Sequence, residues 1–215
     1  MALSVSPTRI RLTRGASREI TVTNAGTSAV GIDVRPSSFV LDLHGKPTID
    51  GGERAVERIR LRPRHVVLGS RGTAVVTVSA TAAAVALPGD HPALVLFTAG
   101  SPRSAGIGVR MRIGVVVLVR GAGRIVHRLE IAALRERGRV LEAELANRGN
   151  VVERPRARIS LSRGGHVVAL LGRGRQTLLP HSRGVERVRF PSRLRGWVTA
   201  QVEVGRVRRT FRIRL

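Results

Sequence analysis

The sequence has no cysteine and no tyrosine, and it has one tryptophan and one lysine among 215 residues. Without cysteine, the chain can form neither a disulfide framework nor a metal site built on thiolates. Aromatic residues make up only 2%, so Val, Leu, Ile and Ala must fill the interior, as they do in packed β-sheets. The scarcity of aromatics also argues against specific nucleic-acid recognition, because such sites stack bases on aromatic side chains.

Long hydrophobic runs are missing as well. The longest, such as Ile113–Val119, falls far short of the roughly 20 apolar residues that span a bilayer. The start of the chain, Met1–Pro7, reads as a strand and not as the basic and then apolar course of a signal peptide. We therefore expect contact with a membrane only through a segment that this chain does not contain.

No residue pattern indicates catalysis, a cofactor or a metal. The histidines show no ligand spacing and mostly lie beside Gly or Pro, at positions 44, 65, 91, 127, 166 and 181. The serines include no Gly-x-Ser-x-Gly elbow. Gly121–Ile125 and Gly172–Arg175 resemble pieces of phosphate-binding loops but lack the strand–loop–helix setting. We predict a protein that is not an enzyme and needs no cofactor, and we keep Gly172–Arg175 as a candidate anion-binding turn.

Positive charge is the most conspicuous excess. The net charge is +24, and nearly all of the cations are arginines. A surface of this kind attracts nucleic acids, or an anionic polymer or membrane surface. The arginines are spread through almost every predicted strand and turn, which is also the pattern of a codon composition that replaces lysine by arginine. All of these interpretations stay open at this point.

The same short pattern occurs twice, at Glu19–Gly26 and at Val140–Gly149. In each, apolar and polar residues alternate, which gives a strand with one buried and one solvated face. Each strand then ends in Asn-x-Gly and is followed by a second strand-like run. We interpret the two as equivalent strands of two successive β-sandwich domains.

The strands between and around this pair follow one another at the turn spacing of immunoglobulin-like domains. Pro7 breaks the first strand, Leu3–Leu12, and predicts that the chain changes sheets there. The apolar run Ala93–Ala99 predicts a central strand, and Ile107–Val119 predicts a strand that closes the first sandwich. We interpret the short segment Ala82–Ala86 as a connection.

The predicted fold class is therefore all-β, with two tandem immunoglobulin-like β-sandwich domains. The glycine pair in Gly121–Gly123 marks the boundary, which gives domains of residues 1–120 and 121–215. The candidate binding residues are four arginines and the single tryptophan, namely Arg110, Arg112, Arg173, Arg175 and Trp197. For Trp197 we favour a place in the core, with a surface anchor as the alternative.

Several short segments resemble one known family. They are Val5–Pro7, Thr23–Gly26, Phe39–Gly45, Leu87–His91 before Ala93–Phe97, and Ile113–Val119 followed by Val140–Gly149. Together they resemble bacterial cell-surface proteins of the WxL-interacting type, most strongly over residues 3–119. More broadly, they resemble extracytoplasmic immunoglobulin-like domains, including the amino-terminal domain of pilus periplasmic chaperones. We carry over no binding residues from either group.

The WxL-interacting resemblance implies a peptidoglycan-binding immunoglobulin-like domain, a second such domain and a place in the cell envelope or outside the cell. From it we expect a non-enzymatic binding or scaffold protein whose partner is an anionic wall polymer or another surface protein. One alternative is a chaperone-like module that donates an edge strand, with Ile107–Val119 as the donor. The other is a nonspecific binder of polyanions or nucleic acid. The sequence does not predict an oligomeric state.

Overall fold

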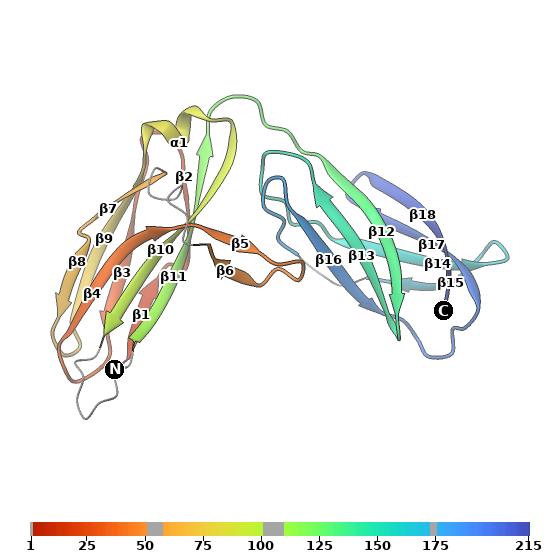
Figure 1. The fold of residues 1–215 in the computed structure, drawn as a ribbon, viewed down its shortest axis with the longest axis horizontal. Helices are drawn as coiled ribbons and strands as arrows, with labels where there is room; N and C mark the ends of the chain where they lie inside the picture. Colours follow the sequence, from red (N-terminus) through yellow and green to blue (C-terminus); the bar gives the residue numbers. More distant parts are fainter. Residues whose placement is uncertain (1, 51–57, 101–109, 173–175) are drawn as a thin grey trace. The chain divides into compact units, whose positions relative to one another are not determined.

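The computed structural model describes residues 2–50, 58–100, 110–172 and 176–215 (Figure 1). In chain order the elements are β1 (Leu3–Ser6), β2 (Arg9–Leu12), β3 (Ser17–Asn24), β4 (Val30–Ser37), β5 (Phe39–Leu41), β6 (Pro47–Ile49), β7 (Ile59–Arg62), β8 (His65–Leu68), β9 (Thr73–Ala80), α1 (Ala82–Ala86), β10 (Gly89–Gly100), β11 (Arg110–Gly121), β12 (Leu129–Arg137), β13 (Val140–Asn147), β14 (Ala157–Arg163), β15 (His166–Leu171), β16 (Arg183–Arg189), β17 (Trp197–Val204) and β18 (Val207–Arg214). The protein is all-β and contains two β-sandwich domains, as the sequence predicted.

The chain divides into two compact units. The first comprises Met1–Phe39 and Ile49–Arg124, and the second comprises Val40–Thr48 and Ile125–Leu215. The second unit therefore includes most of the hairpin β5–β6, which is remote from the rest of that unit in sequence. The domain boundary that we place between residues 120 and 121 stays a prediction.

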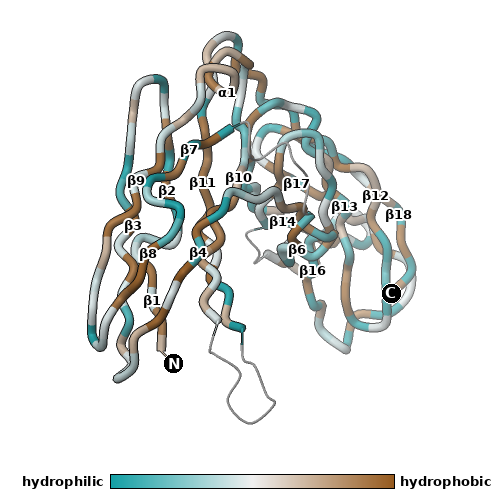
Figure 2. Tube along the Cα trace, turned by 60° about the vertical axis from the view of Figure 1, so that its left-hand side comes forward, coloured by the Kyte–Doolittle hydropathy of each residue, from teal (hydrophilic) through white to brown (hydrophobic). Residues whose placement is uncertain are grey.

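The first unit packs two sheets face to face. One has the order β1–β3–β9–β7 and the other the order β2–β11–β10–β4–β8. Alternate residues of the central strands point into the space between the sheets, where Phe97 and Ile20 are wholly buried. Figure 2 shows the apolar course of β10 and β11 in brown. The core consists of aliphatic side chains with a single aromatic ring, as the composition required.

The first strand is split between the two sheets, as predicted. β1 pairs with β3 in one sheet, whereas β2 runs parallel to β11 in the other. Pro7 lies between them, where it has no N–H to contribute to either ladder. The consequence is that each of the two sheets receives only one half of this strand.

The connection that we predicted at Ala82–Ala86 is instead a short helix, α1. Its N-cap is Thr81, whose side-chain oxygen accepts a hydrogen bond from the backbone N–H of Ala84 at 3.2 Å. Alanine propensity and this cap outweigh the flanking strand and Pro88, which we had taken as evidence against a helix. No helix within the described residues is long and apolar enough to cross a membrane.

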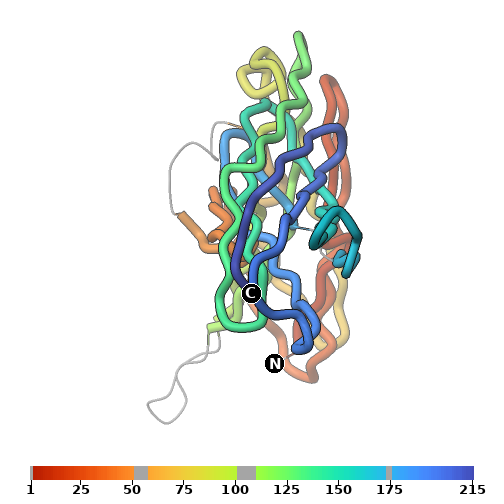
Figure 3. Tube along the Cα trace, turned by 90° about the vertical axis from the view of Figure 1, so that its right-hand side faces the viewer, coloured from red at the N-terminus to blue at the C-terminus, as the bar shows by residue number. Residues whose placement is uncertain are grey.

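The second unit is also a sandwich. Its sheets have the orders β12–β13–β16 and β15–β14–β17–β18, and a core of Leu, Ile, Val and Ala side chains with Phe190 lies between them. Figure 3 shows the β17–β18 hairpin in dark blue running beside the green β12 of the other sheet. On the solvated face of β13, Glu142 and Glu144 form ion pairs with arginines of the neighbouring strands, among them Arg187 at 2.7 Å from Glu142.

The two Asn-x-Gly patterns occupy equivalent positions in the two sandwiches. Asn24 ends β3 and Asn147 ends β13, and both side chains are buried. In each, Nδ2 donates to the carbonyl four residues ahead, at 2.8 Å in the first unit and 2.7 Å in the second. In each, Oδ1 accepts the N–H of the glycine at 3.0 Å. The repeated pattern therefore stands for a repeated turn, which confirms the equivalence inferred from sequence.

Candidate functional site

One half of β11 has a strand on only one side. β11 pairs with antiparallel β10 along its whole length, from Arg110 opposite Gly100 to Gly121 opposite Gly89. On its other side, β2 pairs only with Val116–Val119. Within the described part of the chain, Arg110–Val115 has no strand on that side, and we call this segment the free edge of β11.

The free edge exists because the first strand changes sheets at Pro7. If β2 extended upstream of Arg9, it would lie along Arg110–Val115 and close the sheet. The residues upstream of Pro7 instead form β1, which pairs with β3 in the opposite sheet. The change of sheet at Pro7 thus leaves six residues of β11 without a neighbouring strand at the border of this sandwich.

Backbone groups of the free edge point outward. The N–H of Val116 donates to the carbonyl of Thr8 at 3.0 Å, so the peptide groups of Val116 face the β2 side. Because these groups alternate in direction along a strand, those of the even-numbered residues Arg110, Arg112 and Gly114 face the same side. They offer donors and acceptors to an added strand.

A row of apolar side chains runs along the inner face of β11 and continues into the free edge. Val115 and Val117 are wholly buried in the core. Met111 and Ile113 lie on the same face but are only half-buried. The apolar row of β11 thus continues out of the core and alongside the unpaired backbone. An added strand would cover both the backbone groups and these two side chains, and burial of that apolar area is favourable.

The outer face of the same segment is basic. Arg110 and Arg112 are exposed there and line a pocket of about 490 Å³. The pocket is shared among four strands, and its remaining lining residues are Gly31, Asp33, Arg35, His65, Leu96, Thr98 and Gly100. Nδ1 of His65 lies 3.0 Å from a carboxylate oxygen of Asp33. That hydrogen bond, helped by the nearby cations Arg35 and Arg110, lowers the pKa of Asp33.

The residues that we predicted from sequence are only partly brought together. Arg110 and Arg112 lie side by side on the outer face of the free edge. Sequence spacing could predict that they share a face, but not that the strand is unpaired beside them. Arg173 and Arg175 lie outside the described residues. Trp197 belongs to the second unit, and our preferred assignment of it to the core is wrong.

Trp197 is a surface residue with 56% of its area exposed. The guanidinium of Arg212 lies over its ring, 5.1 Å from the centroid, on the outer face of the sheet that contains β17 and β18. The alternative that we kept, a tryptophan exposed at the start of a strand, is the one that the structure supports. That Trp197 serves as an anchor stays a prediction.

Sequence reasoning overlooked Arg9. It is the first residue of β2, is exposed, and lies opposite Val116 where the free edge ends. The signal was present, since Arg9 directly follows Pro7 and Thr8, but its importance depends on the pairing of β2 with β11. That pairing joins residues more than a hundred positions apart and cannot be read from local pattern.

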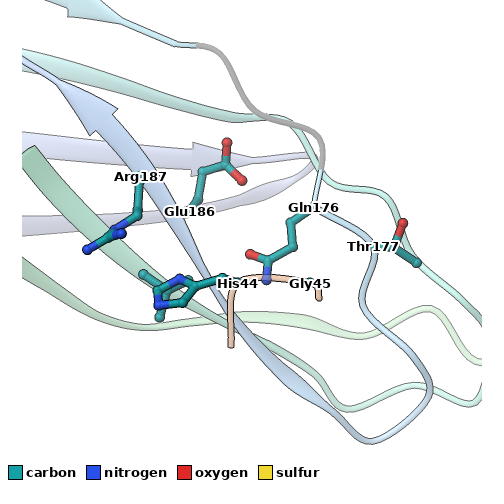
Figure 4. A pocket seen from close by; sticks show the side chains of 7 residues that line it. His44, Gly45, Gln176, Thr177, Glu186 and Arg187 are labelled. Carbon is teal, nitrogen blue, oxygen red and sulfur yellow. The ribbon is translucent and has the colours of Figure 1, made fainter. Parts of the chain in front are cut away.

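A polar pocket of about 360 Å³ lies in the second unit (Figure 4). Figure 4 shows the Gln176 amide directed toward the hairpin residues His44 and Gly45, with Glu186 and Arg187 behind them. The carbonyl of Leu43 accepts two bonds at 2.6 Å, from Nε2 of Gln176 and from the N–H of Val185. These contacts attach the hairpin tip to β16, so we assign the pocket a structural role.

Metal binding has no geometric support in the described ranges, which contain no cluster of three or more histidine, aspartate or glutamate side chains that could hold an ion. Where ionisable groups approach one another within these ranges, a carboxylate contacts arginine or histidine and not a second carboxylate. The His127–Glu153 contact at 2.6 Å is one example, and Asp90 with Arg120 is another.

No protein-family model matches the chain, and no curated protein matches it by sequence. Solved structures match along its whole length. The class 5 fimbriae chaperone CfaA is 10% identical with a TM-score of 0.61, and the match covers 99% of this chain and 98% of that one. The YadV chaperone is 14% identical with a TM-score of 0.57 and full coverage of both chains. These values show that the chain shares the fold of fimbrial chaperones.

A third match is to a chain from the CsuC–CsuE chaperone–tip adhesion subunit pre-assembly complex of the archaic chaperone-usher Csu pili of Acinetobacter baumannii. It is 12% identical with a TM-score of 0.56, and the match covers 99% of this chain and 98% of that one. The matching chain of this complex and the two fimbrial chaperones each align with both sandwich domains of this chain.

These matches correct our first assignment. The sequence resemblance to the WxL-interacting type is wrong, because the structures that match over both domains are pilus chaperones. The wall-polymer binding that we expected from that family is withdrawn with it. The broader resemblance to pilus chaperones, which we had noted only for the first domain, extends over the whole chain. The expectation of a non-enzymatic protein agrees with the fold shared with these chaperones.

Proposed function

We propose that this protein is an extracytoplasmic, non-enzymatic chaperone that binds a subunit of a surface fibre by donating the edge of β11. The observation that carries the proposal is the free edge, six residues long, with unpaired backbone beside a half-buried apolar row. Strand addition to an exposed edge obtains affinity from main-chain hydrogen bonds and specificity from alternate side chains. The fold shared with fimbrial chaperones supports the same assignment.

The partner would be a protein whose own sandwich lacks a strand. Such a protein exposes an apolar groove until another strand fills it. Met111 and Ile113 would fill that groove from one side, while Val115 keeps the base of the donor strand anchored in the core of the chaperone. The donor strand is held rigidly because β10 pairs with it along its full length. A rigid donor loses little conformational entropy on binding.

The location of Arg9 favours one direction for the added strand. A strand that runs parallel to β11 along the free edge ends beside Thr8 and Arg9, in line with β2. Its carboxyl terminus would then lie near the Arg9 guanidinium, which pairs well with a carboxylate. A strand running the other way would bring an ammonium group to the same arginine, which is unfavourable. We therefore propose parallel addition.

A peptide-binding experiment on the full chain tests this function. The probe is an eight-residue peptide that alternates valine with asparagine and has a free carboxyl terminus. We expect binding to the wild-type chain and a loss of at least about tenfold in affinity for the double variant Met111→Asp, Ile113→Asp, because each carboxylate would be buried under the added strand. Both positions are half-exposed in the unbound chain, so we expect this variant to fold.

The matched control is Val67→Asp. Val67 is an exposed apolar residue (68%) on β8, the strand at the opposite border of the same sheet. It introduces the same carboxylate away from the free edge and should bind the peptide as the wild type does. Equal loss of affinity in Val67→Asp and in the double variant would contradict donation by β11, as would unchanged binding by the double variant.

A further inference from the structure

The outer face of the free edge contains two exposed arginines at alternate positions. Arg110 and Arg112 have their side chains on this face, while Met111 between them points inward. A strand added beside them places its own alternate side chains on the same outer face, roughly 5 Å from theirs. The free edge therefore presents two different rows of side chains to a partner, an apolar row on its inner face and a cationic row on its outer face.

The cationic row makes no ion pair of its own within the described part of the chain. Among the described residues, neither Arg110 nor Arg112 has an ion pair, and Arg35, which lines the same pocket, has none either. The only carboxylate in the pocket belongs to Asp33, and His65 already contacts it at 3.0 Å. Elsewhere on this protein, strand glutamates are paired with cross-strand arginines, as Glu142 is with Arg187. Within the described ranges, the arginines of the free edge have only the more distant Asp33 as an acidic neighbour, and no ion pair with a carboxylate on an adjacent strand.

We propose that the strand added to the free edge is acidic on its outer face, with aspartate or glutamate at two alternate positions opposite Arg110 and Arg112. This inference rests on the proposed function and identifies the class of partner: a segment in which apolar and acidic residues alternate. The apolar residues enter the row of Met111 and Ile113, and the acidic ones reach the pocket that Arg35 shares. Opposite charges directly across two strands stabilise their pairing, and like charges disfavour it.

Charge at these positions would also provide selectivity. The chain has a net charge of +24, so any acidic segment is attracted to it from a distance. Only an acidic residue in register with Arg110 or Arg112 gains a close contact after the strand has paired. A strand of lysine and apolar residues would meet the same arginines as like charges and would be rejected. The arginines would thus set the register of the partner as well as its sign.

The test uses three eight-residue peptides that share their valines and alternate them with aspartate, asparagine or lysine. Affinities for the full chain are measured at about 150 mM salt, where surface charges more than roughly 8 Å apart are largely screened. Amide exchange at Arg110, Arg112 and Gly114 is measured in parallel and reports strand addition itself. We expect the aspartate peptide to bind about tenfold more tightly than the asparagine peptide, and the lysine peptide to bind most weakly.

The decisive variant is Arg110→Glu with Arg112→Glu, which should invert the order so that the lysine peptide binds best. Its control is Arg60→Glu with Arg62→Glu, two exposed arginines at alternate positions of β7 in the other sheet. The control changes the net charge by the same amount and should keep the wild-type order. If both variants lose the preference alike, the effect comes from net charge and the inference is overturned.

The remaining outcomes separate this inference from the proposed function. Equal affinities of the aspartate and asparagine peptides, with slowed exchange of the three amides, would overturn the charge preference and leave strand donation intact. Tight binding of the aspartate peptide without slowed exchange would identify a general anion site, and would overturn the inference together with strand donation by β11. Slowed exchange together with an inverted order in the decisive variant supports both.

Discussion

At the scale of single residues, two buried asparagines hold the two sandwiches in shape. Asn147 uses its whole side chain: Nδ2 donates to the carbonyls of Val151 and Leu179, and Oδ1 accepts the N–H of Gly149. Gly149 has no alternative, because a Cβ there would lie 2.1 Å from the carbonyl oxygen of Val126. The Asn-x-Gly pattern could be recognised in the sequence because it ends both strands, but the close approach of Val126 to Gly149 could not.

We expect Asn147→Ala to lower the free energy of unfolding by about 2–4 kcal/mol, since it leaves several buried backbone groups without partners. Denaturation with urea, followed by intrinsic fluorescence and circular dichroism, gives the value. Asn24→Ala should cost a similar amount in the first unit, where the bonds are the same in kind. A change below about 0.5 kcal/mol in Asn147→Ala would show that water replaces these bonds.

Glu186 is buried, and burial raises its pKa above the ordinary value of 4.5. The folded chain therefore holds this proton more tightly than the unfolded chain. The resulting stabilisation is complete below the unfolded pKa and is lost as the pH rises through the folded pKa. We expect Glu186→Gln to raise the melting temperature at about pH 7 by a few degrees and to change it little near pH 4.

Glu142→Gln should change the melting temperature at neutral pH in the opposite direction. The hydrogen bond from Arg187 lowers the pKa of Glu142, so its carboxylate stabilises the fold above the unfolded pKa and this is lost as the pH falls. Glu142→Gln should therefore lower the melting temperature at about pH 7. A melting temperature that falls in Glu186→Gln at neutral pH would mean that the buried carboxylate has found a cationic partner.

At the scale of secondary-structure elements, the sequence predicted most of the strands but not all of their relations. Alternation located β3, β4, β13 and β14, and Pro7 correctly predicted the change of sheet. The segment named as the donor, Ile107–Val119, includes the free edge, although its first three residues lie outside the described ranges. What local pattern could not supply was the point at which β2 stops pairing with β11, because that depends on contacts between distant parts of the chain.

The border strand β15 also has an exposed edge. This border strand contains no Lys, Arg, Asp or Glu, and its side chains Val167 and Leu170 are 61% and 80% exposed. Native proteins usually protect such edges with charge. We expect Leu170→Lys to reduce concentration-dependent light scattering of the chain without changing its unfolding transition.

Leu87→Lys is the control for that variant, because Leu87 is also exposed (58%) but follows helix α1 and belongs to no strand. If both variants lower the scattering equally, added charge alone explains the effect. If neither does, the edge of β15 is already protected by some other means.

At the scale of the whole molecule, the sequence predicted the fold better than it predicted the function. The fold was predictable because two sandwiches need only alternation, turns and aliphatic residues, and the same architecture occurs in fimbrial chaperones at 10–14% identity. The resemblance to the WxL-interacting type was wrong because the motifs that suggested it are short and of low specificity. The free edge, on which our proposal of strand donation rests, depends on where both halves of the first strand pair and so could not be read from those motifs.

The large positive charge makes a separate prediction at this scale. Binding of the neutral valine–asparagine peptide by strand addition should change by no more than about twofold between low and high salt. Binding of a polyanion such as heparin should weaken steeply over the same range, because it depends on release of counterions. Titrations of both ligands at several salt concentrations compare the two directly. A peptide affinity that falls as steeply as that of heparin would contradict strand pairing.

The measurement closest to the central claim is residue-resolved amide exchange of the full chain with and without the valine–asparagine peptide. Strand donation predicts slowed exchange at Arg110, Arg112 and Gly114, whose N–H groups face the free edge, and no change on β8 at the opposite border. Bound peptide with unchanged exchange at all three residues, or with slowed exchange on β8 instead, would contradict donation by β11.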